Sequence, residues 1–146
     1  MNRTTLLKSI GASVVAFSLL SSPVEATVNA ISLVVRVDNA QAGGGPVRVA
    51  MFDRASWLGR AVDAEETAAT GASVRLNLTA PAAGRYGFAI YQDANRDGRL
   101  NRNIVGLPTE PVAFSNGAVI RFGPPSFQDA AVTIAHDSET VVSFPQ

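Results

Sequence analysis

Apolar and polar residues alternate with a period of two through most of this chain beyond residue 30, and that rhythm restricts it to β-structure. Successive side chains of a strand point to opposite faces, so a half-buried strand shows this alternation. The alternating segments are 31–38, 47–52, 74–79, 86–91, 120–122, 132–134 and 142–144. We therefore predict about seven strands, and the Gly, Pro, Asn and Asp clusters between them are typical of an all-β, antiparallel β-sandwich.

The first 26 residues have the pattern of a cleavable export signal. Arg3 and Lys8 precede an uncharged stretch with an apolar centre at residues 10–20. A membrane-spanning helix needs about 20 strongly apolar residues, so this run is too short. We predict cleavage after Ala26, with Ala30 as the alternative cut, rather than a helix that stays in the fold. The mature chain, residues 27–146, is then a single domain without an integral membrane segment.

The absence of a twin-Arg motif favours the Sec route, which places the mature domain in the periplasm or outside a bacterial cell. The chain has no Cys, which excludes disulfides, Cys-bound zinc and a Cys nucleophile. Twelve basic residues balance 12 acidic ones, so the electrostatic basis for nucleic-acid binding is missing. His136 is the only His, and we expect it in a polar turn.

Two segments allow more local predictions. Asp63 and Glu66 have the spacing of a capping box, so we expect a short helix or irregular connection in residues 63–69. Gly84 precedes Tyr86 after a turn, which is typical of a tyrosine corner, where the hydroxyl bonds back to the connection between the sheets.

The strongest chemical motif directly follows the strand that ends near residue 92. Asp93, Asn95 and Asp97 alternate at loop positions one, three and five, with Gly98 at six, and Asn101 follows. This spacing is typical of a Ca²⁺ loop, because the ion takes six to eight oxygen ligands. Position twelve is Ile104, where an EF-hand has a bidentate Glu.

Charge makes any such calcium site weak. Residues 93–103 contain two acids against three arginines, and calcium affinity rises with the charge of the ligands. Glu110 could complete a site. The alternative is an Asx-rich turn in which the Asp and Asn side chains bind the local backbone. No cofactor is needed for folding under either interpretation.

Three arginines occupy outward positions of predicted strands. Arg36, Arg48 and Arg75 could form a basic row on one face that holds an anionic glycan. Like charges opposite each other destabilise a sheet, so either the strands lie in different sheets or carboxylates such as Asp38 lie between them. The alternative is a solvated face without a ligand.

The second half of the chain contains four distinctive segments: Asp93-x-Asn95-x-Asp97-Gly98, Gly106-x-Pro108-x-Glu110, Phe114-Ser115-Asn116 and Phe122-Gly123-Pro124-Pro125-x-Phe127-x-Asp129-Ala130. In these segments it resembles a bacterial family of exported proteins known only as a domain of unknown function, DUF2141, and the resemblance covers most of residues 31–144. The resemblance implies an immunoglobulin-like or transthyretin-like β-sandwich in the cell envelope, with no established reaction or ligand. Family members often have His and Asp where this chain has Gln92 and Asn101, which weakens a metal role here.

The same segments predict a stiff, polar rim. Pro108, Pro124 and Pro125 fix φ and mark rigid loops, while Phe114 and Phe127 could pin those loops to the sandwich. The polar residues presented there, and so the candidate ligand-binding residues, are Glu110, Ser115, Asn116 and Asp129. The alternative is that Glu110 and Asp129 only satisfy backbone amides of these loops.

These observations favour an exported, non-enzymatic β-sandwich module whose rim at residues 93–130 binds a small ligand or an ion or is purely structural. Its partner would be a small ligand, a glycan or an envelope protein. One alternative is a calcium-stabilised adhesion or carbohydrate-binding module. A second is a hydrolase that uses two carboxylates among Asp93, Asp97, Glu110 and Asp129.

Overall fold

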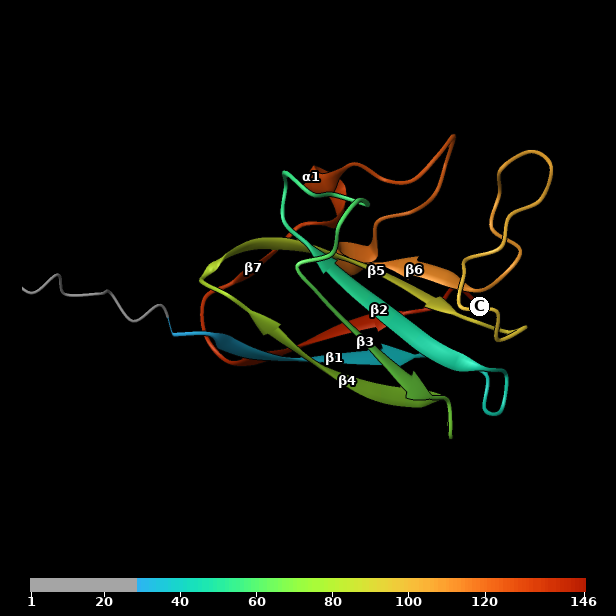
Figure 1. Ribbon diagram of the computed structural model, residues 1–146, viewed down its shortest axis with the longest axis horizontal. Helices are drawn as coiled ribbons and strands as arrows, with labels where there is room; N and C mark the ends of the chain where they lie inside the picture. The colour runs from blue at the N-terminus through green and yellow to red at the C-terminus, as the bar shows by residue number, and fades with distance from the viewer. Residues whose placement is uncertain (1–28) are drawn as a thin grey trace, which may run out of the picture.

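Residues 29–146, which the computed structural model describes, form two β-sheets packed face to face (Figure 1). The strands are β1 (Ile31–Asp38), β2 (Pro46–Phe52), β3 (Asp63–Ala68), β4 (Ser73–Ala80), β5 (Gly84–Gln92), β6 (Val112–Phe114), β7 (Val132–Ile134) and β8 (Ser138–Ser143), with a 3-10 turn η1 (Ser115–Gly117) and one helix α1 (Phe127–Ala130). The predicted β-sandwich is confirmed. The predicted export signal, residues 1–26, lies outside the described residues.

The strand order is β4-β1-β8 in the three-stranded sheet and β3-β2-β5-β6 in the five-stranded sheet, where β7 also pairs with β5. All pairs are antiparallel except β1 and β8, which run parallel. The turn between β7 and β8 carries the exposed His136, as predicted, and the Asp137 carboxylate accepts a hydrogen bond from the Ser32 amide at 2.8 Å. This contact fastens β8 beside the start of β1. None of the described helices is long and apolar enough to cross a membrane.

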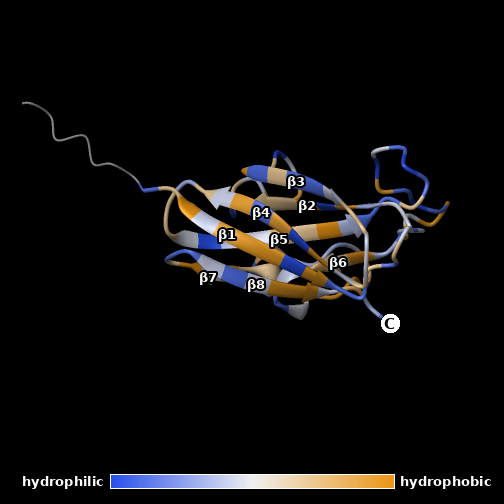
Figure 2. Cartoon of the chain, turned by 90° about the horizontal axis from the view of Figure 1, so that it is seen from below, coloured by the Kyte–Doolittle hydropathy of each residue, from blue (hydrophilic) through white to orange (hydrophobic). Residues whose placement is uncertain are grey.

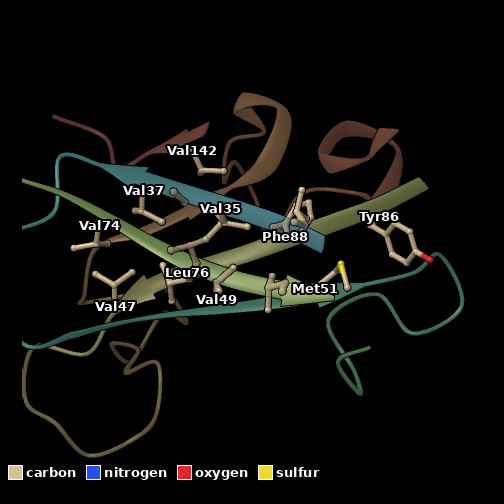
Figure 3. Packing of buried hydrophobic residues seen from close by; sticks show 14 of the residues in the cluster. Val35, Val37, Val47, Val49, Met51, Val74, Leu76, Tyr86, Phe88 and Val142 are labelled. Atoms are coloured by element: carbon tan, nitrogen blue, oxygen red, sulfur yellow. The ribbon is translucent and has the colours of Figure 1, made fainter. Parts of the chain in front are cut away.

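The core lies between the sheets and consists of the inward residues of the alternating segments (Figure 3). In β4, every second residue is buried, from Val74 to Ala80. The fully buried side chains include Leu33, Val35, Val37, Val47, Val49, Met51, Leu76, Leu78, Phe88 and Ile90. Each buried aliphatic or aromatic side chain contributes about 1.5–3 kcal/mol relative to exposure.

The tyrosine corner predicted at Tyr86 is confirmed. Its hydroxyl donates a hydrogen bond to the Ala82 carbonyl at 2.8 Å, and its ring is buried at the edge of the core. This contact anchors the connection from β4 to β5, which crosses from one sheet to the other.

The helix predicted for residues 63–69 is wrong, because this segment forms the edge strand β3. It pairs with β2 from Pro46 to Met51, and most of its residues are exposed. Figure 2 shows its hydrophilic residues in blue. The Asp63 carboxylate does accept hydrogen bonds from backbone amides, but these belong to Ala64 and Thr79, at 2.9 and 2.8 Å, and not to the first turn of a helix. Charged residues on an edge strand protect it from pairing with other chains.

The strand predicted at residues 120–122 is also wrong. This segment lies in the loop between η1 and α1, and the Phe122 side chain is fully exposed. The edge of the five-stranded sheet is instead formed by β6, a strand of three residues that the period-two pattern does not show. Two apolar residues in alternation do not make a strand unless a neighbouring strand offers hydrogen-bonding partners.

A second apolar cluster lies on the outer face of the five-stranded sheet. The half-buried Trp57 packs its ring against Phe52, Phe114 and Phe127, with ring centroids 5.6, 6.2 and 5.8 Å apart. Its indole N–H donates to the Pro125 carbonyl at 2.9 Å. The prediction that Phe114 and Phe127 pin the loops is confirmed, since both rings are buried.

Gly87 provides the flat surface on which Trp57 lies, which yields a test of this cluster. A Cβ at Gly87 would stand 2.5 Å from Trp57 Cζ3. We expect Gly87→Ala to displace the indole, to lower the free energy of unfolding by about 1–3 kcal/mol, and to change the fluorescence of this single Trp.

Urea unfolding followed by fluorescence measures both effects. Gly71→Ala is the control, because a Cβ there meets nothing within 4 Å, and its stability should stay within about 0.5 kcal/mol of wild type. Equal behaviour of the two variants would contradict the packing described for Trp57.

Candidate functional site

The Asp93 side chain is fully buried directly after β5 and organises the loop that follows it. Its Oδ1 accepts a hydrogen bond from the Asp97 amide at 3.1 Å, and its Oδ2 accepts from the Gly98 amide at 2.8 Å. The Arg48 guanidinium donates to Oδ2 at 3.2 Å. A buried carboxylate is tolerated only when it is paired and hydrogen-bonded, and Asp93 meets both conditions.

Glu110 holds the same loop from the other side. It is 9% exposed, its Oε1 accepts from the Ala94 amide at 2.9 Å, and its Oε2 accepts from the Asn101 amide at 2.9 Å. The two carboxylate oxygens thus join the beginning and the end of the loop. Glu110 therefore does what the sequence analysis gave as the alternative to ligand binding: it satisfies backbone amides of the loop.

Asp97 binds the side chains that the motif places around it. Its Oδ2 accepts from the amide groups of Asn101 and Asn95, at 2.9 and 3.0 Å, and its Oδ1 accepts from the Arg99 amide at 2.9 Å. These hydrogen bonds, with that from Asn101 the strongest cause, hold the pKa of the Asp97 carboxyl below its ordinary value.

The four candidate metal ligands, Asp93, Asn95, Asp97 and Asn101, therefore do meet in one loop, but they bind one another and the backbone. Among residues 29–146, no group of three or more His, Cys, Asp or Glu side chains is placed to hold a metal ion. A calcium ion would have to displace N–H donors from Asp93 and Asp97. Asn101 Oδ1 is the loop's buried oxygen without a hydrogen-bond partner.

Three of the candidate ligand-binding residues fasten α1 and η1 to the sheet. The fully buried Ser115 hydroxyl accepts from the Phe88 amide at 2.8 Å and donates to the Ala130 carbonyl. Asn116 donates to the Asp129 carbonyl at 2.8 Å, and the Asp129 carboxylate accepts from the Ser126 hydroxyl at 2.7 Å. Their polar groups thus support the fold around α1.

The fold does not bring the four candidate ligand-binding residues together. Ser115 lies against Phe88, whereas Glu110 lies beside the loop that begins at Asp93, five residues further along the direction of β5. At about 3.3 Å per residue, this is roughly 16 Å. Figure 1 shows α1, which carries Asp129, far from the end of β5. Asp129 therefore does not join the other three carboxylates.

The basic row predicted from Arg36, Arg48 and Arg75 is wrong, because Arg48 lies in the five-stranded sheet and the other two lie in the three-stranded sheet. Arg36 and Arg75 are directly opposite each other in β1 and β4. Glu139 of β8 relieves their repulsion, with N–O distances of 3.5 and 3.2 Å to Arg36 and Arg75. That face is neutralised by its own carboxylates.

One open concave surface lies on the outer face of the five-stranded sheet, and a wider one of about 650 Å³ lies at the other end of the molecule around His136 and Asp137. Two hollows of about 500 and 330 Å³ share Tyr91 in their lining, and we call them together the Tyr91 trough. Alanines line both hollows, Ala50 and Ala64 in the first and Ala89 in the second, and Ala50 pairs with both of the others across the sheet. Small outward side chains leave the surface hollow there. The walls include Arg48 and Glu66 in one hollow and Leu58, Leu100, Arg102 and Pro124 in the other.

Charge around the trough is paired on one side. Arg48 contacts Glu66 at 2.6 Å as well as the buried Asp93, so its charge is neutralised. Partial burial raises the pKa of the Tyr91 hydroxyl above its ordinary value of 10, and the nearby carboxylates of Asp93 and Glu110 act in the same direction while Arg48 opposes them. The phenol is therefore a hydrogen-bond donor at neutral pH.

Sequence reasoning missed the trough. Its signal was present in the outward positions of the alternating segments, which hold Ala50 and Ala89 beside the aromatic Tyr91. The adjacency of those positions depends on the pairing of β2 with β5.

The sequence model of one protein family matches residues 35–142, which is most of the chain. The family is described as "Uncharacterized protein conserved in bacteria (DUF2141)". Neither the curated proteins nor the solved structures include a significant match to this chain.

The role of Asp93 as the central acceptor of its loop predicts a large effect of Asp93→Asn. The amide keeps the shape but replaces a charged acceptor of two N–H groups and of Arg48 with a neutral group. We expect the free energy of unfolding to fall by about 3 kcal/mol, measured by urea titration. Asp97→Asn, at the exposed tip of the same motif, should cost clearly less, and equal losses would contradict the assignment.

The lowered pKa of Asp97 predicts a pH dependence. A carboxyl whose pKa is lower in the folded than in the unfolded state contributes stability above the unfolded value, here 3.8, and loses it as the pH falls through the folded value. We expect the urea midpoint of wild type to fall more steeply below about pH 4 than that of Asp97→Asn. Parallel acid profiles of the two proteins would rule out this contribution.

Proposed function

We propose that this protein is an exported, non-enzymatic β-sandwich module that binds a neutral saccharide in the Tyr91 trough. The chain belongs to the bacterial family DUF2141, whose sequence model covers residues 35–142. The pattern of residues 1–26 supports export. Within the described residues the trough is open and preformed, since rigid strands make its floor.

The hydrogen bonding of the acidic residues supports a role without catalysis. Acid–base or nucleophilic chemistry needs carboxylates that face a substrate. Asp93 and Glu110 are buried and accept from backbone amides, and Asp129 binds Ser126 at another place on the sheet. The trough itself is lined by Tyr91, alanines, Arg48 and the β3 carboxylates Glu65 and Glu66, and Glu66 is already paired with Arg48.

The composition of the trough supports a saccharide as the ligand class. A sugar ring has an apolar C–H face and an edge of hydroxyl groups, so it suits a surface that is aromatic at its centre and polar at its rim. Tyr91 offers an aromatic face and a hydroxyl donor, while Glu66 and Arg102 offer hydrogen bonds at the two ends. Pairing of Arg48 with Glu66 and Asp93 favours a neutral over an anionic sugar.

The observation that carries this proposal is that the two hollows meet at Tyr91. The test titrates the full chain with cellohexaose, chitohexaose and maltohexaose by calorimetry and by NMR. We expect at least one of them to bind, and Tyr91→Ala to weaken that binding about tenfold, since aromatic contacts add about 1 kcal/mol or more beyond area. Tyr91→Phe should bind with intermediate affinity.

Asn77→Ala is the matched control, because Asn77 is exposed on β4 in the opposite sheet. Its affinity should equal that of wild type. Binding of none of the three oligosaccharides, or full binding by Tyr91→Ala, would reject the saccharide site. Cleavage of the oligosaccharide during the titration would reject the non-enzymatic role.

A further inference from the structure

Large apolar side chains stand in water at the tips of two loops. Ile104 and Phe122 are fully exposed, and Val105 is 71% exposed. None of these three side chains lines the Tyr91 trough. Isolated exposed apolar residues are ordinary, but three side chains this exposed at the tips of two loops are candidates for contact with another surface. We call Ile104, Val105 and Phe122 the apolar tips.

The loop that carries Ile104 and Val105 is fixed by its own hydrogen bonds. Asn103 Oδ1 accepts from the amides of Val105 and Leu107, at 3.1 and 3.0 Å, and the Gly106 amide donates to the Asn103 carbonyl at 2.9 Å. Gly106 has a φ of 82°, which favours glycine. Ile104 and Val105 therefore occupy the two central positions of a tight turn, where polar residues or Pro are usual.

Both loops rise on one side of the molecule. In Figure 1 the golden loop at upper right, beyond the end of β5, and the orange-red loop at the top both point away from β1 and β4 of the other sheet. The hollow that Leu100 and Arg102 line from the first loop is lined from the second by Pro124. The apolar tips thus lie on a common side.

The exposed charge around the apolar tips is mainly positive. Residues 98–108 and 117–126 contain Arg99, Arg102 and Arg121 and no acidic residue. In the rest of the first loop, Asp97 is exposed, whereas Asp93 and Glu110 are buried. All three arginines are exposed. Arg102 is three positions from Val105, and Arg121 is next to Phe122.

We propose that these two loops dock the protein on an anionic phospholipid bilayer, with the apolar tips in the interfacial region and the three arginines at the phosphates. The transfer of apolar side chains from water to the boundary between headgroups and acyl chains is favourable. Each basic residue near an anionic surface adds about 1 kcal/mol. Long arginine side chains can hold their charge at the phosphate level while the tips insert.

The arrangement of the tips favours a bilayer over a protein partner. A specific protein interface buries a contiguous patch of about 800 Å² on each side. Here the three apolar tips stand on two separate loops, and Arg102 and Arg121 lie close to them in sequence. A bilayer accepts separate tips because it has no fixed shape to match.

The test places an environment-sensitive fluorophore on the full chain. Because the chain has no Cys, Val105→Cys creates a unique labelling site. We expect its emission to shift to the blue with vesicles of phosphatidylcholine and phosphatidylglycerol in a ratio of 3:1, and to shift little with phosphatidylcholine alone or in 1 M salt. The same dye at Val141→Cys, 45% exposed on β8, should not shift.

Two further variants of the labelled protein separate the contributions. Ile104→Ser with Phe122→Ser should abolish the shift, and both residues are fully exposed, so the fold is unaffected. Arg99→Gln with Arg121→Gln should raise the lipid concentration for a half-maximal shift about tenfold to thirtyfold. The local reporter keeps the result independent of any vesicle binding by residues 1–28.

Several results would overturn the proposal. These are a Val105 dye that shifts equally with both kinds of vesicle, one that does not shift with anionic vesicles, and a shift that persists when Ile104 and Phe122 are serine. A blue shift that grows with protein concentration in the absence of lipid would assign the tips to self-association instead.

Discussion

The packing of inward valine, leucine and phenylalanine side chains between the two sheets is the interaction on which the rest of the structure depends. The chain has no Cys, so no disulfide limits its unfolded state and the core must supply the stability. Period-two alternation gives each strand a buried row and an outward row. The outward row of the five-stranded sheet is therefore free to carry the alanines and Tyr91 of the trough without loss of core packing.

Hydrogen bonds and ion pairs of charged side chains hold the loop after β5, which contributes no residue to the hydrophobic core. Asp93 and Glu110 together accept hydrogen bonds from four backbone amides of the loop. Because the loop has no neighbouring strand, these amides would otherwise have no partner within the protein. Arg48 balances the buried charge of Asp93 and also contacts Glu66 on the edge strand β3. One guanidinium thus links the acidic loop, the centre of the sheet and its edge, and it fixes one wall of the trough.

Local rules predicted what depends on neighbours in sequence. The alternating strands, the Tyr86 corner and the loop anchors Phe114 and Phe127 follow from residue spacing, and the structure has them. The errors concern pairing over long distances. Residues 63–68 have a helical capping pattern but lie beside β2, and residues 120–122 alternate but have no partner strand.

The candidate site failed for a related reason. Spacing correctly grouped Asp93 with Asp97, because they belong to one loop, but it could not show that their oxygens bind amides. It could not assign Arg36 and Arg48 to different sheets, and it could not separate Glu110 from Ser115 along β5. The two faces of the sandwich differ as a result: Glu139 neutralises the arginines of the three-stranded sheet, whereas residues 98–108 and 117–126, in the loops over the five-stranded sheet, contain three arginines and no acidic residue. Under the two proposals, a bilayer that receives the apolar tips lies beside the hollow formed by Leu100 and Pro124, so a saccharide bound at Tyr91 would sit at the level of the lipid headgroups.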